Sequence, residues 1–445
     1  MTAEAIYTRL PVLLQQAACS VEGWRIRRHR YGSRFEELLR QAEERMTWPE
    51  DRLLEYRDRR LKAFLELARR HVLYYQGAES LDQPLDKDTV RQSPSLFRST
   101  AYRTAELRPV HTSGTTGGGL RFWATTEALQ EQWAVWWRYR RWHGLQPATP
   151  CGYFGGRAVV PVEQSQPPFW RYDLAGRQIL FSASHFHEAH LPSYVNELRR
   201  RRPPWLHGYP SLLALLAAYV LDRGLDLGYR LQWITTGAEN LLPQQTQLMT
   251  RAFGVRPRQH YGMAEAVANA SECEAGRLHI DEDFSMVELM PVQTAPGVCK
   301  VTGTNFTNPA TPLIRYGVND HVTPSAGACS CGRPGRVLER IDGRLEDYVV
   351  LADGRRLGRL DHIFKDLVAV REAQIVQRVP GEVTLRVVRS RGYDSADEQR
   401  LLTEARMRLG ASTRIDLEYI DRVERSATGK LRFVVTHVAG GKAMA

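Results

Sequence analysis

The run VHTSGTTGGGLRF, residues 110–122, places small hydroxyl residues and glycines between an apolar start and an end rich in β-forming residues. Glycines let a backbone turn tightly and approach a ligand, and serine and threonine hydroxyls donate hydrogen bonds, so the run suits phosphate oxygens. It is not a Walker loop, because no Gly-Lys-Ser/Thr follows the glycines at the required spacing. Taken alone, the run fits a flexible hairpin turn equally well.

Length and composition predict a protein of more than one region without a membrane span. A chain of 445 residues exceeds the size at which one hydrophobic core keeps growing, so we expect a large region and at least one smaller one. No apolar run approaches membrane-spanning length. The arginine-rich stretch after the first apolar segment is in the wrong order for a signal peptide, so we expect a cytoplasmic protein.

Positive charge dominates the chain, which carries a formal charge of +11 and arginine clusters in WRIRRHRYGSR and NELRRRRPPW. This balance fits nucleic acid, an anionic membrane surface or a phosphorylated substrate as a partner. Residues 199–202 have a simpler explanation, because arginines at a helix end complement the helix dipole and the following prolines stop the helix.

The pattern along the chain predicts an α/β fold. Residues 35–75 have the spacing of two amphipathic helices broken near TWPED, and residues 152–306 alternate short β-rich runs with helical runs. The chain then continues with strand-like EVTLRVVRS, helix-like SADEQRLLTEARMRLG and strand-like TRIDLEYIDRV. We therefore expect a large N-terminal domain of layered sheets and helices, residues 1–343, and a small α+β C-terminal domain, residues 344–445.

The tryptophan-rich segment EQWAVWWRYRRWHG could stack nucleic-acid bases or pack on a core. Trp133, Trp136 and Trp137 fall at helical spacing, which favours core packing. We expect the neighbouring arginines to run along the apolar surface and extend their charged ends to solvent.

Six short pieces follow one another along the chain: TSGTTGGGL, ITTGAENL, QHYGMAEA, PLIRYGVND, GRLEDY and RSATGKLRF. In this order and at these distances they resemble the adenylate-forming superfamily of acyl-CoA ligases and related acid-activating enzymes. The resemblance is to the branch typified by phenylacetate-CoA ligases. Within this branch, the chain resembles the capsule-biosynthesis-type relatives through four further pieces, FGGR, PPFWRYDL, HGYPSLLA and CSCGRPG. The resemblance covers roughly residues 95–435.

The resemblance implies use of ATP and Mg²⁺ and a role for each matching residue. Residues 113–119 would grip the β- and γ-phosphates, Tyr261 would stack on the adenine, and Asp320 would hydrogen-bond the ribose hydroxyls. Glu265 would hold Mg²⁺. The nucleotide-binding set implied is Ser113, Gly114, Thr115, Thr116 and Gly117 of the phosphate loop, Gly237, Ala238 and Glu239 of the adenine-side loop, Tyr261, Asp320, and Arg344 near the ribose and phosphates.

The chemistry explains why a mobile lysine is needed. A carboxylate that attacks the α-phosphate of ATP is an anion approaching an anion, so Mg²⁺ and a positioned cation must offset the charge that develops. The resemblance makes Lys430 that cation, carried into the site by the C-terminal domain about a hinge near Glu346. Seen alone, ATGK also fits an exposed turn with a solvated lysine.

Two positions depart from the family pattern. Many members carry a lysine after the glycine of the phosphate loop and a hydroxyl residue before the acid of YGxTE, whereas this chain has Gly118 and Ala264. Two phosphate contacts are therefore missing from the pattern. Subgroup variation and a slow or non-adenylating homologue are both consistent with this difference.

The acyl acceptor and the acid are separate questions. Coenzyme A is the family's usual acceptor, and an amine or hydroxyl acceptor is the alternative. By resemblance, His207, Tyr209 and Ser211 line the acyl pocket, and aryl, short-chain and amino acids all remain candidates. A zinc-containing nucleic-acid-binding protein is the alternative from another class, but the sequence holds no recognised binding module or sustained basic face, so we expect small-molecule partners and no nucleic acid.

The cysteines carry a second signal, since a cytosolic chain with six of them is not expected to form a disulfide framework. Thiolates and imidazole near glycine-assisted turns suit tetrahedral zinc, and buried free thiols are the alternative. In the subgroup resembled, the structural zinc ligands correspond to Cys273, His279, Cys329 and Cys331. We expect no metal at His185, His187 and His190, because side chains at these spacings do not converge on one face of a strand or a helix. We expect Cys19, Cys151 and Cys299 to be ordinary thiols.

Overall fold

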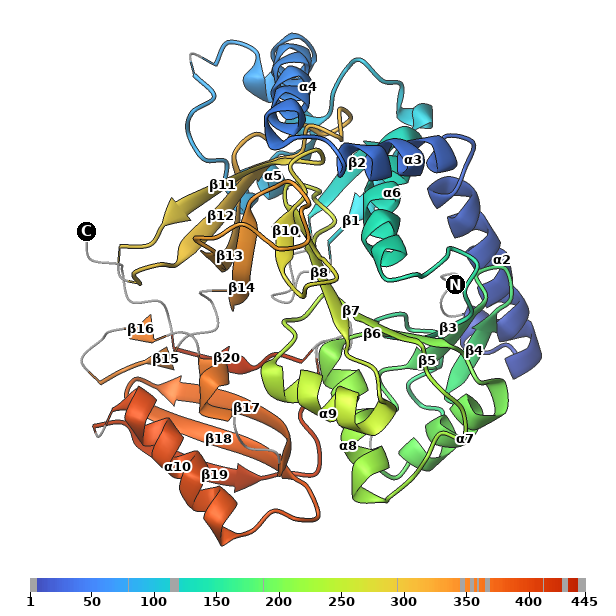
Figure 1. Ribbon diagram of the computed structural model, residues 1–445, viewed down its shortest axis with the longest axis vertical. Coiled ribbons are helices and arrows are strands. Elements are labelled where there is room, and N and C mark those ends of the chain that lie inside the picture. The colour runs from blue at the N-terminus through green and yellow to red at the C-terminus, as the bar shows by residue number, and fades with distance from the viewer. Residues whose placement is uncertain are drawn as a thin grey trace. The chain divides into compact units, whose positions relative to one another are not determined.

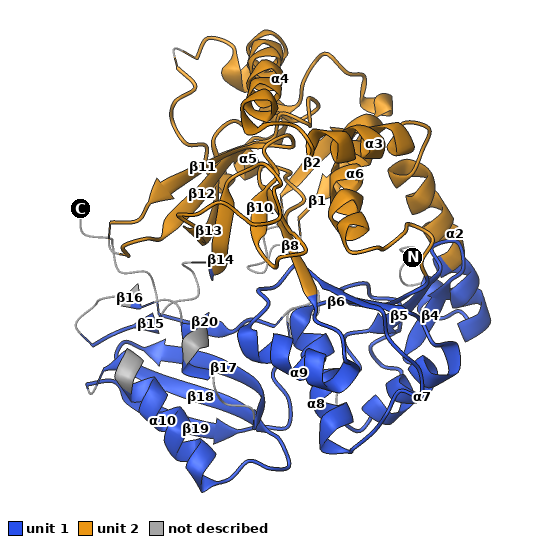
Figure 2. Ribbon diagram, viewed as in Figure 1, with its two compact units in different colours: residues 1–19, 150–257, 343–445 blue, residues 20–149, 258–342 orange. Residues whose placement is uncertain are grey.

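The computed structural model describes residues 6–78, 80–112, 120–186, 188–293, 295–344, 349–352, 356–357, 360–364, 369–410, 412–425 and 431–438. The chain forms two compact units (Figure 2). Unit 1 contains residues 1–19, 150–257 and 343–445, and unit 2 contains residues 20–149 and 258–342. The boundary at residue 19 falls inside the first labelled helix, α2 (Val12–Arg30).

Unit 1 is built on a parallel sheet. Its strands are β3 (Cys151–Gly155), β4 (Trp170–Asp173), β5 (Gln178–Ser182), β6 (Trp205–Gly208) and β7 (Trp233–Thr236), in the order β7-β6-β3-β5-β4, with only the edge strand β4 antiparallel. Its helices are α7 (Leu191–Arg201), α8 (Pro210–Asp222) and α9 (Pro243–Phe253). Gly208 must be glycine, because a Cβ there would lie 2.0 Å from the carbonyl oxygen of Phe154 on the neighbouring strand.

The C-terminal part of unit 1 is a separate small domain with its own core. The strand order is β19-β18-β17-β20, and α10 lies along one face of that sheet (Figure 1). Asp394 caps α10 by accepting hydrogen bonds from the amides of Ala396 and Asp397. The elements are β15 (Val349–Val350), β16 (Arg356–Leu357), β17 (Val370–Val379), β18 (Glu382–Arg389), α10 (Ser395–Leu409), β19 (Arg414–Tyr419) and β20 (Val434–Thr436).

Unit 2 combines helices with an antiparallel sheet of order β11-β12-β13-β14-β10-β9-β8. Its helices are α3 (Phe35–Arg45), α4 (Glu50–His71), α5 (Lys87–Gln92) and α6 (Thr126–Trp142). Its strands are β1 (Leu107–His111), β2 (Arg121–Thr125), β8 (Arg258–Gly262), β9 (Asn269–Glu272), β10 (Leu278–Ile280), β11 (Met286–Pro291), β12 (Cys299–Thr304), β13 (Tyr316–Pro324) and β14 (Val337–Arg344). β1 and β2 form a separate hairpin.

The predicted fold class is confirmed, with a large α/β part and a separate small α+β domain at the C-terminus. The two predicted N-terminal helices are α3 and α4, and the arginine cluster at residues 199–202 ends α7 as expected. The domain boundary at residue 344 stays a prediction. Among the described residues, no helix is both long enough and apolar enough to cross a membrane.

The arginines of α6 differ from the expectation that their charges would reach solvent. Trp137 is buried as predicted, but Arg138 is fully buried and donates to Asp281 at 2.6 Å and to Asp283 at 2.7 Å. Arg45 at the end of α3 also donates to Asp283, at 2.6 Å. Burial alone would raise the pKa of Asp283, but Arg138 and Arg45 hold it well below its usual range. The reason for the difference is that α6 faces two buried carboxylates distant in sequence.

We predict that Arg138→Met lowers the free energy of unfolding by about 3–5 kcal/mol, because it leaves Asp281 and Asp283 buried without their shared cation. Urea denaturation followed by circular dichroism measures the loss. Arg141→Met is the matched control, since its ion pair with Glu43 is partly exposed and is worth less than about 1 kcal/mol. Equal losses in the two variants would contradict a structural role for the buried charges.

Candidate functional site

Each compact unit carries one group of the predicted site residues. Unit 1 holds the adenine-side loop and the acyl-pocket residues, and unit 2 holds Tyr261, Glu265, Asp320 and the candidate zinc ligands. Arg344 ends β14. The predicted residues that lie outside the described part of the chain are Ser113, Gly114, Thr115, Thr116, Gly117, Gly118, His187, Glu346 and Lys430.

The residues on either side of the phosphate-loop run are hydrogen-bonded to each other. Thr112 follows β1 and Leu120 precedes β2, and the amide of Thr112 donates to the carbonyl of Leu120 at 3.0 Å. The amide of Leu120 in turn donates to the hydroxyl of Thr112 at 2.9 Å. Leu120 is fully buried, so both ends of the run are attached to the core of unit 2.

The two residues assigned to adenine and ribose lie side by side in unit 2. Tyr261 is on β8 and Asp320 is on β13, 59 residues later, and the Tyr261 hydroxyl donates to Asp320 Oδ2 at 2.8 Å. Both residues are half-buried. Asn319 has φ of 58°, in the left-handed region, where its backbone turns immediately before Asp320. The structure thus brings together the two residues that would hold the nucleoside.

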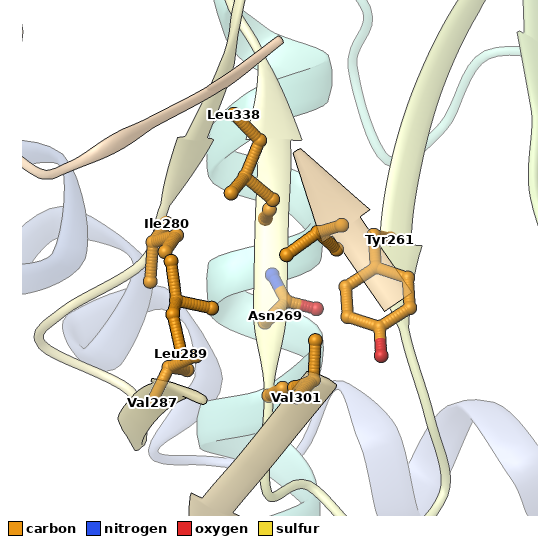
Figure 3. Close-up of a pocket in the computed structure, with 10 residues that line it drawn as sticks. Tyr261, Asn269, Ile280, Val287, Leu289, Val301 and Leu338 are labelled. Atoms are coloured by element: carbon orange, nitrogen blue, oxygen red, sulfur yellow. The ribbon is translucent and has the colours of Figure 1, made fainter. Parts of the chain in front are cut away.

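A small cavity lies behind Tyr261 (Figure 3). Its lining contains one polar amide, Asn269, and is otherwise apolar apart from Tyr261 itself. With no charged side chain in its wall, this cavity suits neither a carboxylate nor a phosphate. It belongs to the core behind β8. Its lining residues are Tyr261, Ala268, Asn269, Ala270, Ile280, Val287, Leu289, Val301, Val322 and Leu338.

The turn that carries Glu265 is held by buried amides. Asn305 donates through Nδ2 to the Glu265 carbonyl at 3.2 Å, and Gln132 donates to the carbonyl of Met263 at 3.0 Å. Glu265 is buried, and the preceding Ala264 packs against an apolar cluster of unit 2. A carboxylate is the ligand type that Mg²⁺ prefers, so Glu265 fits the predicted role by its donor atoms.

In unit 1, the predicted acyl-pocket and adenine-side residues follow two adjacent parallel strands. His207 is on β6, Tyr209 and Ser211 begin α8, and residues 237–239 follow β7. His207 Nδ1 lies 2.9 Å from the hydroxyl of Thr235 on β7, and burial raises the pKa of Tyr209. Because the carboxyl ends of parallel strands meet at one edge, these residues gather where α/β proteins bind ligands.

The Glu239 carboxylate joins three segments of unit 1. Oε2 accepts a hydrogen bond from the amide of Ser211 at 3.2 Å, and Oε1 accepts one from the amide of Leu431 at 2.8 Å. Ala238, the preceding residue, has φ of 68°, a conformation that favours glycine. Since Leu431 directly follows Lys430 in the sequence, the backbone next to the predicted catalytic lysine lies at the adenine-side loop.

Arg425 and Glu372 were missed by the sequence analysis. Arg425 donates through Nη1 to the Ser211 hydroxyl at 2.7 Å and through Nη2 to the Glu372 carboxylate. Their side chains are only 11% and 5% exposed. Burial raises the pKa of Glu372, and Arg425 opposes that shift. A glutamate inside the β-forming run VREAQIV was the available signal for a buried partner.

Unit 2 also assembles the four candidate metal ligands. The sulfurs of Cys273 and Cys329 lie 3.6 Å apart, Cys331 Sγ lies 3.3 Å from His279 Nε2, and all four ligand atoms fall within 4.8 Å of one another. His279 Nδ1 lies 3.3 Å from the carbonyl of Pro334, which leaves Nε2 facing the thiols. Burial lowers the pKa of His279, and neutral imidazole is the metal-binding form.

The other described cysteines and histidines have different surroundings. All six cysteines are free, with Cys151 and Cys299 buried on strands and Cys19 half-buried. Among the histidines, cysteines and acids that the structure describes, the Cys273–His279–Cys329–Cys331 set is the group arranged to hold a metal ion. His185 and His190 instead stack on Phe169, at ring distances of 5.0 and 4.0 Å.

We predict that Arg425→Met destabilises the protein more at pH 8 than at pH 5. Without Arg425, the folded-state pKa of Glu372 rises further above its unfolded value of about 4.3, so stability falls as pH increases through that interval. We expect a loss of about 3 kcal/mol at pH 8 and a smaller one at pH 5, measured by urea denaturation. Arg422→Met, at an exposed arginine, is the control. A loss for Arg425→Met that does not change with pH would refute the buried pair.

Comparison with known proteins places these features in a family context. The family model for the CapK C-terminal domain matches residues 352–437. Protein CapK of Staphylococcus aureus is 22% identical over 454 aligned residues, which cover 97% of this chain and 99% of that protein. Phenylacetate-coenzyme A ligase of Thermus thermophilus is 27% identical over 160 residues, or 34% of this chain and 36% of that enzyme.

Solved structures share the fold. The crystal structure of 2-hydroxyisobutyryl-CoA ligase in the postadenylation state, in complex with R3-HIB-AMP, superimposes with a TM-score of 0.61 at 16% identity, covering 97% of this chain and 91% of that one. This fold, the full-length similarity to Protein CapK and the partial similarity to a phenylacetate-CoA ligase agree with the motif order along the chain. These similarities support the resemblance of the chain to the adenylate-forming superfamily.

Proposed function

We propose that this protein uses ATP to convert a carboxylic acid into its acyl-adenylate and then passes the acyl group to a second nucleophile. The observation that carries the proposal is the Tyr261–Asp320 hydrogen bond, which pairs the residues assigned to adenine and ribose at 2.8 Å.

In the proposed reaction, an oxygen of the carboxylate forms a bond to the α-phosphorus of ATP while the bond from that phosphorus to the bridging oxygen breaks. Pyrophosphate leaves with the electron pair. Mg²⁺, which Glu265 would hold, supplies positive charge that offsets the charge developing on the phosphate oxygens. Asp320 orients the ribose, and Lys430 places a cation at the α-phosphate.

The assignment of Lys430 is supported by its neighbour in the sequence. Leu431 donates its amide to Glu239, whose carboxylate also accepts from Ser211 at the start of α8. The C-terminal domain is further attached within unit 1 by Arg371, which donates to Asp222 at 2.6 Å and to Glu188 at 2.8 Å. These contacts bring the C-terminal domain to the loop that follows β7.

Coenzyme A is the acceptor that we favour, because the solved structure of similar fold is a CoA ligase and a sequence relative is named for the same acceptor. Transfer to an amine or hydroxyl is the second candidate, since the relative similar over the full length, Protein CapK, is not named for coenzyme A. The two differ in whether free coenzyme A accelerates turnover. Six free cysteines are consistent with a reducing, cytoplasmic setting.

The test is ATP–pyrophosphate exchange across a panel of aryl, short-chain and amino acids with Mg²⁺ present. A true substrate should drive exchange in the wild type. Lys430→Ala should keep its affinity for ATP but lose exchange by a factor on the order of a hundred or more, because a charge contact to the transition state is removed. Asp320→Ala should instead raise the ATP concentration needed for half-maximal exchange.

The two variants control for each other, since one should change the rate at saturating ATP and the other the ATP requirement. Exchange by Lys430→Ala at the wild-type rate would remove the lysine from the mechanism. Unchanged ATP binding in Asp320→Ala would remove the ribose assignment. If no acid in the panel drives exchange, adenylation of these acid classes is excluded.

We further propose that Cys273, His279, Cys329 and Cys331 hold one structural zinc ion. Zinc bonds of about 2.3 Å to sulfur and about 2.0 Å to nitrogen imply ligand atoms about 3.5–3.8 Å apart in a tetrahedron. The observed separation of 3.6 Å between two sulfurs falls in that range, the 3.3 Å between sulfur and nitrogen lies slightly below it, and all four ligand atoms lie within 4.8 Å of one another. The carbonyl of Pro334 is the partner that a zinc-bound imidazole requires at its other nitrogen.

We expect about one zinc ion per chain in protein purified without chelators, measured by elemental analysis. Cys329→Ser should lose the metal and melt at a lower temperature, while exchange activity at low temperature changes less, because the ion stabilises the fold and takes no part in the reaction. Cys299→Ser is the matched control, a buried strand cysteine outside the cluster, and should keep its zinc. Full zinc content in Cys329→Ser would rule out this ligand set.

A further inference from the structure

Helix α2 turns its apolar side chains toward solvent. Leu13, Leu14, Val21 and Trp24 are between 53% and 79% exposed. In contrast, Gln15 is buried, where it accepts a hydrogen bond from Arg171 Nε at 2.7 Å. This is the reverse of the usual arrangement, in which a surface helix buries its apolar face and exposes its polar one.

The exposed apolar residues form one continuous stripe. Residues 14, 17, 21, 24 and 28 follow one another at alternating steps of three and four, so they fall on one face of α2. The stripe contains leucine, alanine, valine and tryptophan and ends in Arg28. Contiguous exposed apolar surface of this kind marks an interaction site.

The charge of α2 points to the nature of the partner. Arg25 and Arg28 are exposed beside the stripe, whereas Arg27 and Arg30 lie over the rings of Tyr31 and Trp133. The only acidic residue of α2 is Glu22, which pairs with Arg25 at 2.8 Å. The Arg28 guanidinium lies 5.6 Å from the centre of the Trp24 ring. An exposed face with leucine, valine and tryptophan beside arginines suits the interface of an anionic bilayer, where tryptophan rings and arginines lie at the level of the headgroups.

We propose that α2 docks on the surface of a membrane that contains anionic lipids. The apolar stripe enters the boundary between headgroups and acyl chains, and the arginines contact lipid phosphates. A second copy of the chain complements this face less well. Two α2 helices packed together would bring their arginines close to one another, and each helix has only one carboxylate to offset the repulsion. The helix lies on the bilayer, in agreement with the absence of a membrane-crossing helix among the described residues.

The test is flotation of the full chain with two kinds of vesicle. Neutral vesicles contain phosphatidylcholine alone, and anionic vesicles contain phosphatidylcholine with about one third phosphatidylglycerol. The stripe variant is Leu14→Ser with Val21→Ser and Trp24→Ser, and the charge variant is Arg25→Gln with Arg28→Gln. Val162→Ser with Leu174→Ser is the matched control, since both positions are more than 70% exposed and lie outside α2. Circular dichroism verifies that each variant is folded.

The wild type and the control should float with the anionic vesicles and not with the neutral ones. The stripe variant and the charge variant should each bind at least about tenfold more weakly. If the stripe variant does not fold, the charge variant alone decides. Binding by both variants at the wild-type level would overturn the proposal, as would no flotation of the wild type. A wild-type dimer in light scattering that the stripe variant converts to a monomer, without vesicle binding, would assign the face to a second copy.

Discussion

Buried charge is the constraint on which both units depend. In unit 2, Arg138 on α6 is fully enclosed and satisfies the carboxylates of Asp281 and Asp283, which follow β10. Asp281 also accepts hydrogen bonds from Asn269 and Ser271 on β9. Since a buried carboxylate without its cation costs several kcal/mol, α6 can occupy only the position that serves these acids. The strands β9 and β8, and with them Tyr261, are placed against that fixed helix.

In unit 1, a second buried pair links the C-terminal domain to the proposed acyl pocket. Arg425 is held by Glu372 inside the small domain and reaches Ser211, while Leu431 reaches Glu239. These two hydrogen bonds each have one charged partner and are worth about 1.5–3 kcal/mol each. A proposed rotation that withdraws Lys430 must break them together with the ion pairs of Arg371 to Asp222 and Glu188. The same rotation can leave Arg425 and Glu372 paired, because both belong to the small domain.

The candidate zinc site and the outward face of α2 illustrate how differently the two kinds of site arise. The four candidate zinc ligands come from two segments, with Cys273 and Cys329 56 residues apart, and they form a set only when the fold brings the segments together. The apolar stripe of α2 is contiguous within one helix, and it becomes a site only because the fold buries Gln15 on the opposite side. One site depends on assembly of distant residues and the other on the orientation of a single element.

The sequence by itself determined the elements whose signals are local. The break between α3 and α4, the end of α7 at its arginines and the helix of the C-terminal domain follow from periodicity, prolines and caps. The motifs also predicted the resemblance to the adenylate-forming superfamily, separate adenine and ribose roles for Tyr261 and Asp320, and the four candidate zinc ligands as a set. Only the tertiary structure decided that Arg138 is buried, that Arg425 joins Ser211 to Glu372, and that α2 exposes its apolar face. The physical reason is that burial and ion pairing depend on what lies opposite a side chain, and Arg138 lies opposite an acid 145 residues away while Arg425 lies opposite a serine 214 residues away.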